Sequence, residues 1–113
     1  MPEHLLVLTT VPDEETAERI ARTLVQERLA ACVSRSSACQ SSYWWQGKIA
    51  EEQEFMLYIK TLNARYPELE KKLVALHPYD VPEVIAIPLV KGFGKYLNWM
   101  EEEADPERQK SSK

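Results

Sequence analysis

The chain has 113 residues and a net charge of −4 at pH 7; 44% of its residues are hydrophobic and 28% are charged. This length and composition predict a single globular domain with a small core. The acidic balance argues against an extended nucleic-acid surface, and no apolar run reaches the ~20 residues of a membrane-spanning helix. Because the first residues also lack the pattern of a secretion signal, we expect a cytoplasmic protein with no nucleic-acid or membrane partner.

The first predicted elements are a strand and an amphipathic helix. Residues 4–10 (HLLVLTT) form a short aliphatic and β-branched run, which is typical of a buried strand. Asp13 then suits the N-cap of a helix, and the two glutamates after it suit the positive end of the helix dipole. One apolar face recurs at helical spacing and consists of Ala17, Ile20, Ala21, Leu24 and Val25.

Three further strands are predicted in the middle of the chain, over residues 30–34, 41–49 and 53–61. The last two form an extended β-hairpin, whose turn we expect around residues 50–52. The segment 53–61 is apolar on both faces, as in a strand inside a sheet. The acidic run at residues 51–54 (EEQE) is interpreted as solvated charge.

Three adjacent aromatic residues mark the first strand of this hairpin. Tyr43, Trp44 and Trp45 occupy consecutive positions, so their side chains alternate between the two faces. At least one of them is expected to be exposed on a monomer. We therefore predict these three residues at a subunit interface.

The second half of the chain predicts a helix over residues 64–77, which Pro78 ends. A strand over residues 83–90 follows, and its Pro88 places it at a sheet edge or a bulge. A glycine turn and a short helix over residues 92–103 complete the pattern.

The order of these elements is strand, helix, strand, strand, helix, strand, helix. This is the order of an α+β, ferredoxin-like βαββαβ fold with an added C-terminal helix. We expect one such domain over residues 1–103 and a disordered polar tail over residues 104–113.

The motifs of common enzymes are missing from the sequence. It has no GxGxxG, no phosphate-binding loop, no HExxH and no GxSxG. Cys32 and Cys39 are separated by six residues, which is neither a zinc-ligand spacing nor a CxxC redox pair. We therefore expect free, partly buried thiols and a protein that is not an enzyme.

The stretch LHPYDVPE contains His77, one of only two histidines in the chain. Together with Asp80 and Glu83 it offers an imidazole and two carboxylates on one short turn, which suits copper or another divalent cation. The alternative is that His77 lies at the C-terminus of the preceding helix, where a cationic side chain is favourable. Spacing alone favours this second interpretation.

Several of these stretches together resemble the CutA family of divalent-cation tolerance proteins. They are TTVPDEETAERIARTLVQERLAACV, YWWQGKI, IKT, LHPYDVPEVIAIPL and YLNWM, between about residue 6 and residue 100. The resemblance implies a ferredoxin-like subunit in a compact homotrimer and a link to tolerance of copper and other divalent metals. It brings no defined catalytic activity.

The chain departs from the family at two places. Some bacterial relatives are thought to bind copper through a first-strand cysteine and two adjacent histidines before Pro-Tyr. This sequence has Thr9 or Thr10 at the first position and Leu76 before His77, so only His77 matches. The segment 34–42 (SRSSACQSS) is also more polar than is usual for the family.

We therefore predict a non-enzymatic homotrimer involved in the response to divalent metal ions, with copper binding at His77 as the candidate site. Tyr79, Asp80 and Glu83 are expected to line a cleft between subunits. The trimer is expected because two short helices cover only one face of a four-stranded sheet. The alternative function is a small-molecule-sensing or scaffolding trimer, similar to the nitrogen-regulatory signalling proteins that share this subunit fold.

Overall fold

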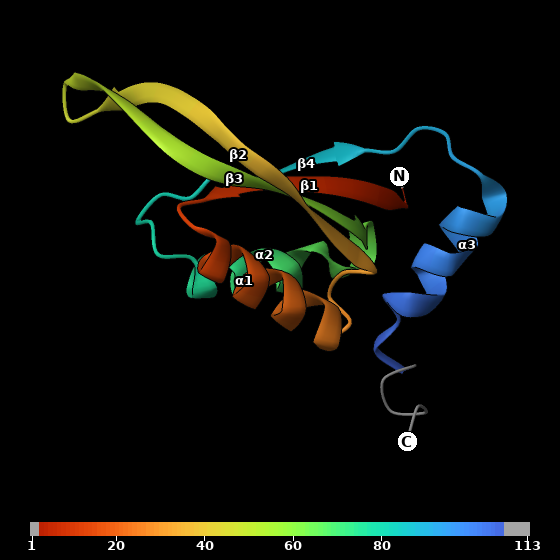
Figure 1. Ribbon diagram of the computed structural model, residues 1–113. Helices are drawn as coiled ribbons and strands as arrows, with labels where there is room; N and C mark the ends of the chain where they lie inside the picture. The colour runs from red at the N-terminus through yellow and green to blue at the C-terminus, as the bar shows by residue number, and fades with distance from the viewer. Residues whose placement is uncertain (1–2, 108–113) are drawn as a thin grey trace.

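A four-stranded antiparallel sheet carries two helices on one face in the computed structural model, which describes residues 3–107 (Figure 1). The sheet has the strand order β2-β3-β1-β4, so β1 and β3 are its inner strands. The elements are β1 (His4–Val11), α1 (Glu14–Gln26), β2 (Cys32–Trp45), β3 (Lys48–Leu62), a 3-10 turn (Asn63–Arg65), α2 (Tyr66–Leu76), β4 (Ile85–Pro88) and α3 (Gly94–Glu103). The predicted α+β ferredoxin-like order with an added C-terminal helix is confirmed.

The main core lies between the sheet and the helices α1 and α2. Helix α1 begins as predicted, because the Asp13 carboxylate accepts a hydrogen bond of 2.7 Å from the Thr16 backbone N–H. Its apolar face then packs against α2 and the inner strands. The fully buried residues of this core include Val7, Val11, Ile20, Leu24, Leu57, Ile59, Leu69 and Leu73.

Helix α3 packs separately against one end of the sheet, through a small cluster formed by Ala31, Leu62, Met100 and Ala104. The Arg28 guanidinium fixes this helix by binding the Glu103 carboxylate at 2.7 Å and the Glu103 carbonyl at 3.1 Å. Ala104 is buried, so packed structure extends one residue beyond the expected domain end. Of the predicted tail over residues 104–113, residues 108–113 lie outside the described residues.

The turn of the long hairpin differs from the prediction. It lies at Gln46 and Gly47, not around residues 50–52, and both residues have positive φ, at 51° and 79°. Two consecutive positive φ values define the two-residue turn whose twist matches that of the paired strands, and glycine adopts this conformation without a steric cost. Residues 50–52 therefore lie in β3 and not in the turn.

The strand before this turn is also longer than predicted. The polar segment 34–42 joins the two expected strands into one, Cys32–Trp45, with a bulge between Arg35 and Ala38. At the bulge the Ser36 hydroxyl accepts a hydrogen bond of 3.0 Å from the Met56 backbone N–H. A side-chain oxygen thus replaces a carbonyl of the ladder where the extra residue interrupts it.

The last strand is shorter than predicted, at Ile85–Pro88 instead of residues 83–90, and it lies at the sheet edge, as Pro88 indicated. Helix α2 ends at Leu76, directly before His77 and Pro78. Within residues 3–107 the structure has no helix that is both long enough and apolar enough to cross a membrane.

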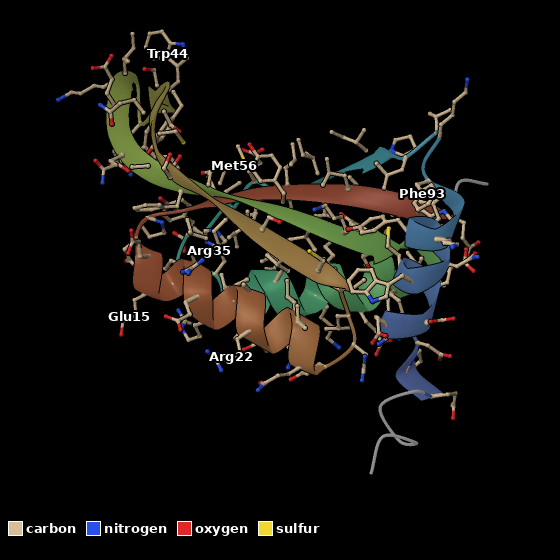
Figure 2. All side chains as sticks on the ribbon, turned by 45° about the vertical axis from the view of Figure 1, so that its right-hand side comes forward. Glu15, Arg22, Arg35, Trp44, Met56 and Phe93 are labelled. Carbon is tan, nitrogen blue, oxygen red and sulfur yellow. The ribbon has the colours of Figure 1, made fainter. Side chains whose placement is uncertain are left out.

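The second face of the sheet has no helix over its middle, and Met56 projects from it in Figure 2. The strand register places six apolar side chains together on this outer face. They are half-buried or exposed, and comprise Leu6, Leu8, Met56, Tyr58, Ile85 and Ile87. An apolar sheet face of this kind is typical of an interaction surface.

Candidate functional site

A groove of about 730 Å³ lies between the long hairpin and the loop that follows α2. The hairpin supplies Tyr43, Trp44 and Trp45 from β2 and Glu52 and Glu54 from β3. The loop supplies Tyr79, Asp80, Val81 and Glu83, and Thr10 contributes from the end of β1. The predicted cleft residues and the predicted interface aromatics therefore meet in one place.

The strand register explains why the hairpin residues gather here. After the bulge, Tyr43 lies opposite Ala50 and Ser41 lies opposite Glu52, so these residues share the outer face. Glu54 is on the same face, two residues further along β3. The bulge decides this arrangement, since one extra residue exchanges the faces of all later residues of β2.

Two phenol–carboxylate hydrogen bonds organise the groove. The Tyr79 hydroxyl donates to the Glu54 carboxylate at 2.7 Å, and the Tyr43 hydroxyl donates to the Glu52 carboxylate at 3.0 Å. Burial and then the bond to Glu54 raise the pKa of Tyr79 well above its usual range, and the bond to Glu52 raises that of Tyr43. Both phenols therefore stay protonated and serve as donors.

The charged side chains that line the groove are all acidic. Its lining carries the carboxyl groups of Glu52, Glu54, Asp80 and Glu83, and the lining residues that the structure describes include no lysine, arginine or histidine. Glu54 is only 4% exposed, so its carboxylate lies in a partly dehydrated environment. Tyr43, Trp44, Trp45 and Tyr79 line the same groove. Carboxylates and aromatic side chains together suit a cation that is joined to an apolar group.

His77 lies behind the groove and does not line it. Its Nε2 is 2.8 Å from the Thr10 carbonyl oxygen, and its Nδ1 accepts a hydrogen bond of 3.2 Å from the Tyr79 backbone N–H. The two bonds select the tautomer that carries its proton on Nε2, and they leave neither ring nitrogen free. The ring also contacts the Tyr79 ring at a centroid distance of 4.8 Å. The histidine thereby fastens the start of this loop to the end of β1.

Within the part of the chain that the structure describes, the side chains that could bind a metal ion are not grouped into a site. Among residues 3–107 no group of three or more histidine, cysteine, aspartate or glutamate side chains is placed to hold one. A metal at His77 would have to replace one of the two hydrogen bonds of its ring. Cys32 and Cys39 are free, partly buried thiols, as expected.

The sequence pointed to part of this site and missed another part. Tyr79, Asp80 and Glu83 line a groove within one chain; their place at a cleft between subunits stays a prediction. Glu52 and Glu54 were interpreted as solvated charge, and for Glu54 this is wrong because the residue is buried. The sequence pattern that could have indicated this is the alternation of side chains along β3. Residues 52 and 54 precede Met56 and Tyr58 on the same face of the strand.

Comparisons with known proteins agree on one family. Residues 5–103 match the family model described as CutA1 divalent ion tolerance protein. A curated relative, the divalent-cation tolerance protein CutA of Thermus thermophilus, is 48% identical over 97 residues, covering 86% of this chain and 94% of the relative. The chloroplastic protein CutA 1 of rice is 43% identical over 96 residues, 85% of this chain, and the chain spans 54% of that longer protein.

Solved structures give the same result. The crystal structure of CutA from Xylella fastidiosa has a TM-score of 0.88 and 46% identity, covering 90% of this chain and 98% of that one. A CutA from Archaeoglobus fulgidus, described as periplasmic, has a TM-score of 0.88 and 36% identity, covering 90% of this chain and 99% of that one. The relatives therefore carry names that place them in different compartments, the chloroplast and the periplasm.

Proposed function

The chain belongs to the CutA1 divalent ion tolerance protein family, and from that premise we propose that it acts in the response to divalent metal ions as a cytoplasmic homotrimer that catalyses no reaction. The family match over residues 5–103 is the observation that carries the link to divalent ions. The family is not generally known for enzymatic activity. Deleting the gene for this protein in its host should lower growth at raised copper or zinc concentrations, and restoring the gene should reverse the effect.

The uncovered outer face of the sheet supports the trimer. Tyr58, Ile85 and Ile87 are between 39% and 49% exposed there, although each belongs to a paired strand of the sheet. Burying a large apolar side chain contributes ~1.5–3 kcal/mol, so covering this face with other copies stabilises the assembly considerably. Light scattering at low micromolar concentration tests it: a mass near three times 13.1 kDa is expected, and a mass near one or two chains would contradict it.

We also propose that His77 binds copper, and the geometry around its ring supports a weak affinity for the metal. Both ring nitrogens already hold hydrogen bonds. The chain also has Thr9 or Thr10, and Leu76, where family relatives are thought to supply further ligands. Calorimetry with Cu(II) and Zn(II) should give weak binding that decreases in His77→Ala. His4→Ala removes the other histidine, which is bonded to Glu101, and serves as the control. Nanomolar copper binding that depends on His77 would contradict this expectation.

One observation favours the alternative of a small-molecule-sensing trimer. The groove has a volume of about 730 Å³, within the ~300–1,000 Å³ typical of ligand pockets. The same calorimetry with common nucleotides separates the two functions. Tight nucleotide binding without a metal would overturn the metal-response proposal and favour sensing.

A further inference from the structure

Helix α1 ends in a turn that has an arginine at a position where glycine is usual. Arg28 has a φ of 58°, in the left-handed region. Its backbone N–H donates to the Val25 carbonyl at 3.1 Å, and the Leu29 N–H donates to the Leu24 carbonyl at 3.0 Å. These two bonds define a Schellman motif, whose left-handed residue is most often glycine. The conformation is unfavourable for an arginine, so the surrounding structure must hold it there.

The contacts of Arg28 join the ends of three helices. Its guanidinium donates to the Glu103 carboxylate at 2.7 Å and to the Glu103 carbonyl at 3.1 Å, in the last turn of α3. Its own carbonyl accepts a hydrogen bond of 3.1 Å from Arg65, which also binds Glu68 in the first turn of α2 at 2.7 Å. The Arg28 and Glu103 side chains are only 22% and 24% exposed, so water screens this ion pair less than a surface pair.

Helix α3 packs on the sheet through a small apolar area. The buried members of its cluster are two alanines, one leucine and one methionine: Ala31, Leu62, Met100 and Ala104. Tyr96 and Trp99, the large aromatic residues of the helix, are 39% and 38% exposed. Figure 1 shows α3 at one end of the sheet, beyond the layer formed by α1 and α2. A second polar contact joins the His4 ring to the Glu101 carboxylate at 2.9 Å, but Glu101 is 46% exposed. An element with so little buried apolar area opens more easily than the main core.

Opening of α3 would uncover a thiol. Cys32, the first residue of β2, is half-buried and lies beside the Tyr96 hydroxyl of α3. Burial and then the neighbouring Cys32 raise the pKa of Tyr96 above its usual range. The other thiol, Cys39, is roughly 20 Å further along β2, past the bulge. The reactivity of Cys32 therefore reports whether α3 is in place.

We propose that α3 is a hinged strap, which opens as a unit while the sheet, α1 and α2 stay folded, and that Arg28 is the latch that keeps it closed. The hinge is the segment before the helix, where Gly92 and Gly94 flank one residue and can absorb the change in backbone angles. The latch accounts for an arginine at a position that favours glycine, since only its long side chain reaches Glu103. All of these contacts lie within one chain, so the strap exists whether or not the chains associate.

Hydrogen exchange and thiol labelling of the full chain test the strap. Mass spectrometry gives the exchange rates of the α3 and α2 amides, and a maleimide gives the labelling rate of Cys32 in a Cys39→Ser background. Arg28→Gly and Glu103→Ala are each expected to raise α3 exchange and Cys32 labelling by about tenfold or more, the effect of losing a charge-assisted hydrogen bond. Exchange in α2 should stay unchanged. Arg28→Lys keeps the charge and should restore part of the protection.

Two further variants sharpen the test. Glu18→Gln breaks the exposed ion pair with Arg22, at 3.4 Å, and is the matched control that should leave α3 exchange and Cys32 labelling unchanged. The double variant Arg28→Gly with Glu103→Ala should open α3 no more often than either single variant, because both remove the same contact.

Three results would overturn the proposal. If the amides of α3 exchange in the native chain only together with those of α2, α3 does not open as a unit. If Arg28→Gly and Glu103→Ala leave α3 exchange and Cys32 labelling unchanged, Arg28 is not the latch. If Arg28→Gly raises exchange in α2 as much as in α3, Arg28 stabilises the whole fold and does not control one helix.

Discussion

Tyr79 connects the two halves of the groove, because its hydroxyl reaches across to the buried Glu54 carboxylate at 2.7 Å. Replacing Tyr79 by Phe keeps the ring and removes the only hydrogen bond that this carboxylate accepts within residues 3–107. We expect the free energy of unfolding to decrease by ~1–3 kcal/mol, the cost of leaving a buried polar group without its partner. Urea denaturation at one fixed protein concentration measures the change.

Tyr43→Phe is the matched control for this substitution. It breaks the equivalent bond to Glu52, but Glu52 is exposed and water replaces the lost donor. The expected change lies within ~0.5 kcal/mol, as for other surface substitutions. If the two variants lose the same free energy of unfolding, the burial of Glu54 does not explain how much the Tyr79 hydrogen bond contributes to stability.

Asp13 makes a pH-dependent contribution at the start of α1. The hydrogen bond from the Thr16 backbone N–H lowers the pKa of its carboxyl below the ordinary value of 3.8. The unfolded chain therefore binds the proton at a higher pH than the folded chain. The stability that comes from the ionised carboxylate is present above pH ~4 and is lost as the pH falls through the lower, folded pKa.

Asp13→Asn isolates this contribution, because asparagine also caps helices but does not titrate. The stability advantage of the native chain over Asp13→Asn is expected to be largest at neutral pH and to shrink progressively below pH ~4. Thermal unfolding of both chains between neutral and acidic pH measures it. An advantage that stays constant to the lowest pH would show that the carboxylate charge makes no contribution here.

At the scale of elements, the hairpin depends on its two-residue turn. Gly47 has a φ of 79°, which residues with a Cβ adopt at a cost of roughly 1–2 kcal/mol. Gly47→Ala is therefore expected to lower the free energy of unfolding by about that amount, although an added Cβ meets no atom within 4 Å. Chemical denaturation measures the loss.

The neighbouring position provides the control. Gln46 also has a positive φ, of 51°, and asparagine tolerates this conformation better than glutamine does. Gln46→Asn is expected to leave stability unchanged or to raise it slightly. A loss in Gln46→Asn comparable with that in Gly47→Ala would mean that side-chain contacts, not backbone conformation, control this turn.

At the scale of the whole molecule, the outer face of the sheet is the surface through which we propose that the subunits assemble. Ile87 lies on this face beside Leu6 and is 43% exposed. Ile87→Glu would bring a charge into the proposed interface without an oppositely charged partner, a change that costs several kcal/mol. We expect the mass in solution, measured by light scattering, to fall to that of a single chain at low micromolar concentration.

Val74 is the matched control because it is similarly exposed, at 46%, but lies on α2, on the other side of the sheet. Val74→Glu is expected to keep the mass of the native assembly. If Val74→Glu dissociates it and Ile87→Glu does not, the subunits meet through their helices and not through the sheet.

The sequence by itself determined the order of elements, because local patterns encode it. The apolar spacing of α1, the Asp13 cap and Pro78 after α2 act within a few residues of one another. The stretch LHPYDVPE likewise indicated a stiff loop with Tyr79, Asp80 and Glu83 beside one another. These features depend on backbone conformation and nearest neighbours, which a single sequence displays directly.

Only the tertiary structure decided what that loop faces. Whether Glu54 is buried depends on the register between β2 and β3, which the bulge after Arg35 and the turn at Gly47 set together. Whether His77 is free depends on the Thr10 carbonyl, 67 residues away along the chain. Pairing across such separations is fixed by packing of the whole sheet, since a shift of one residue would turn every side chain of the strand to the other face.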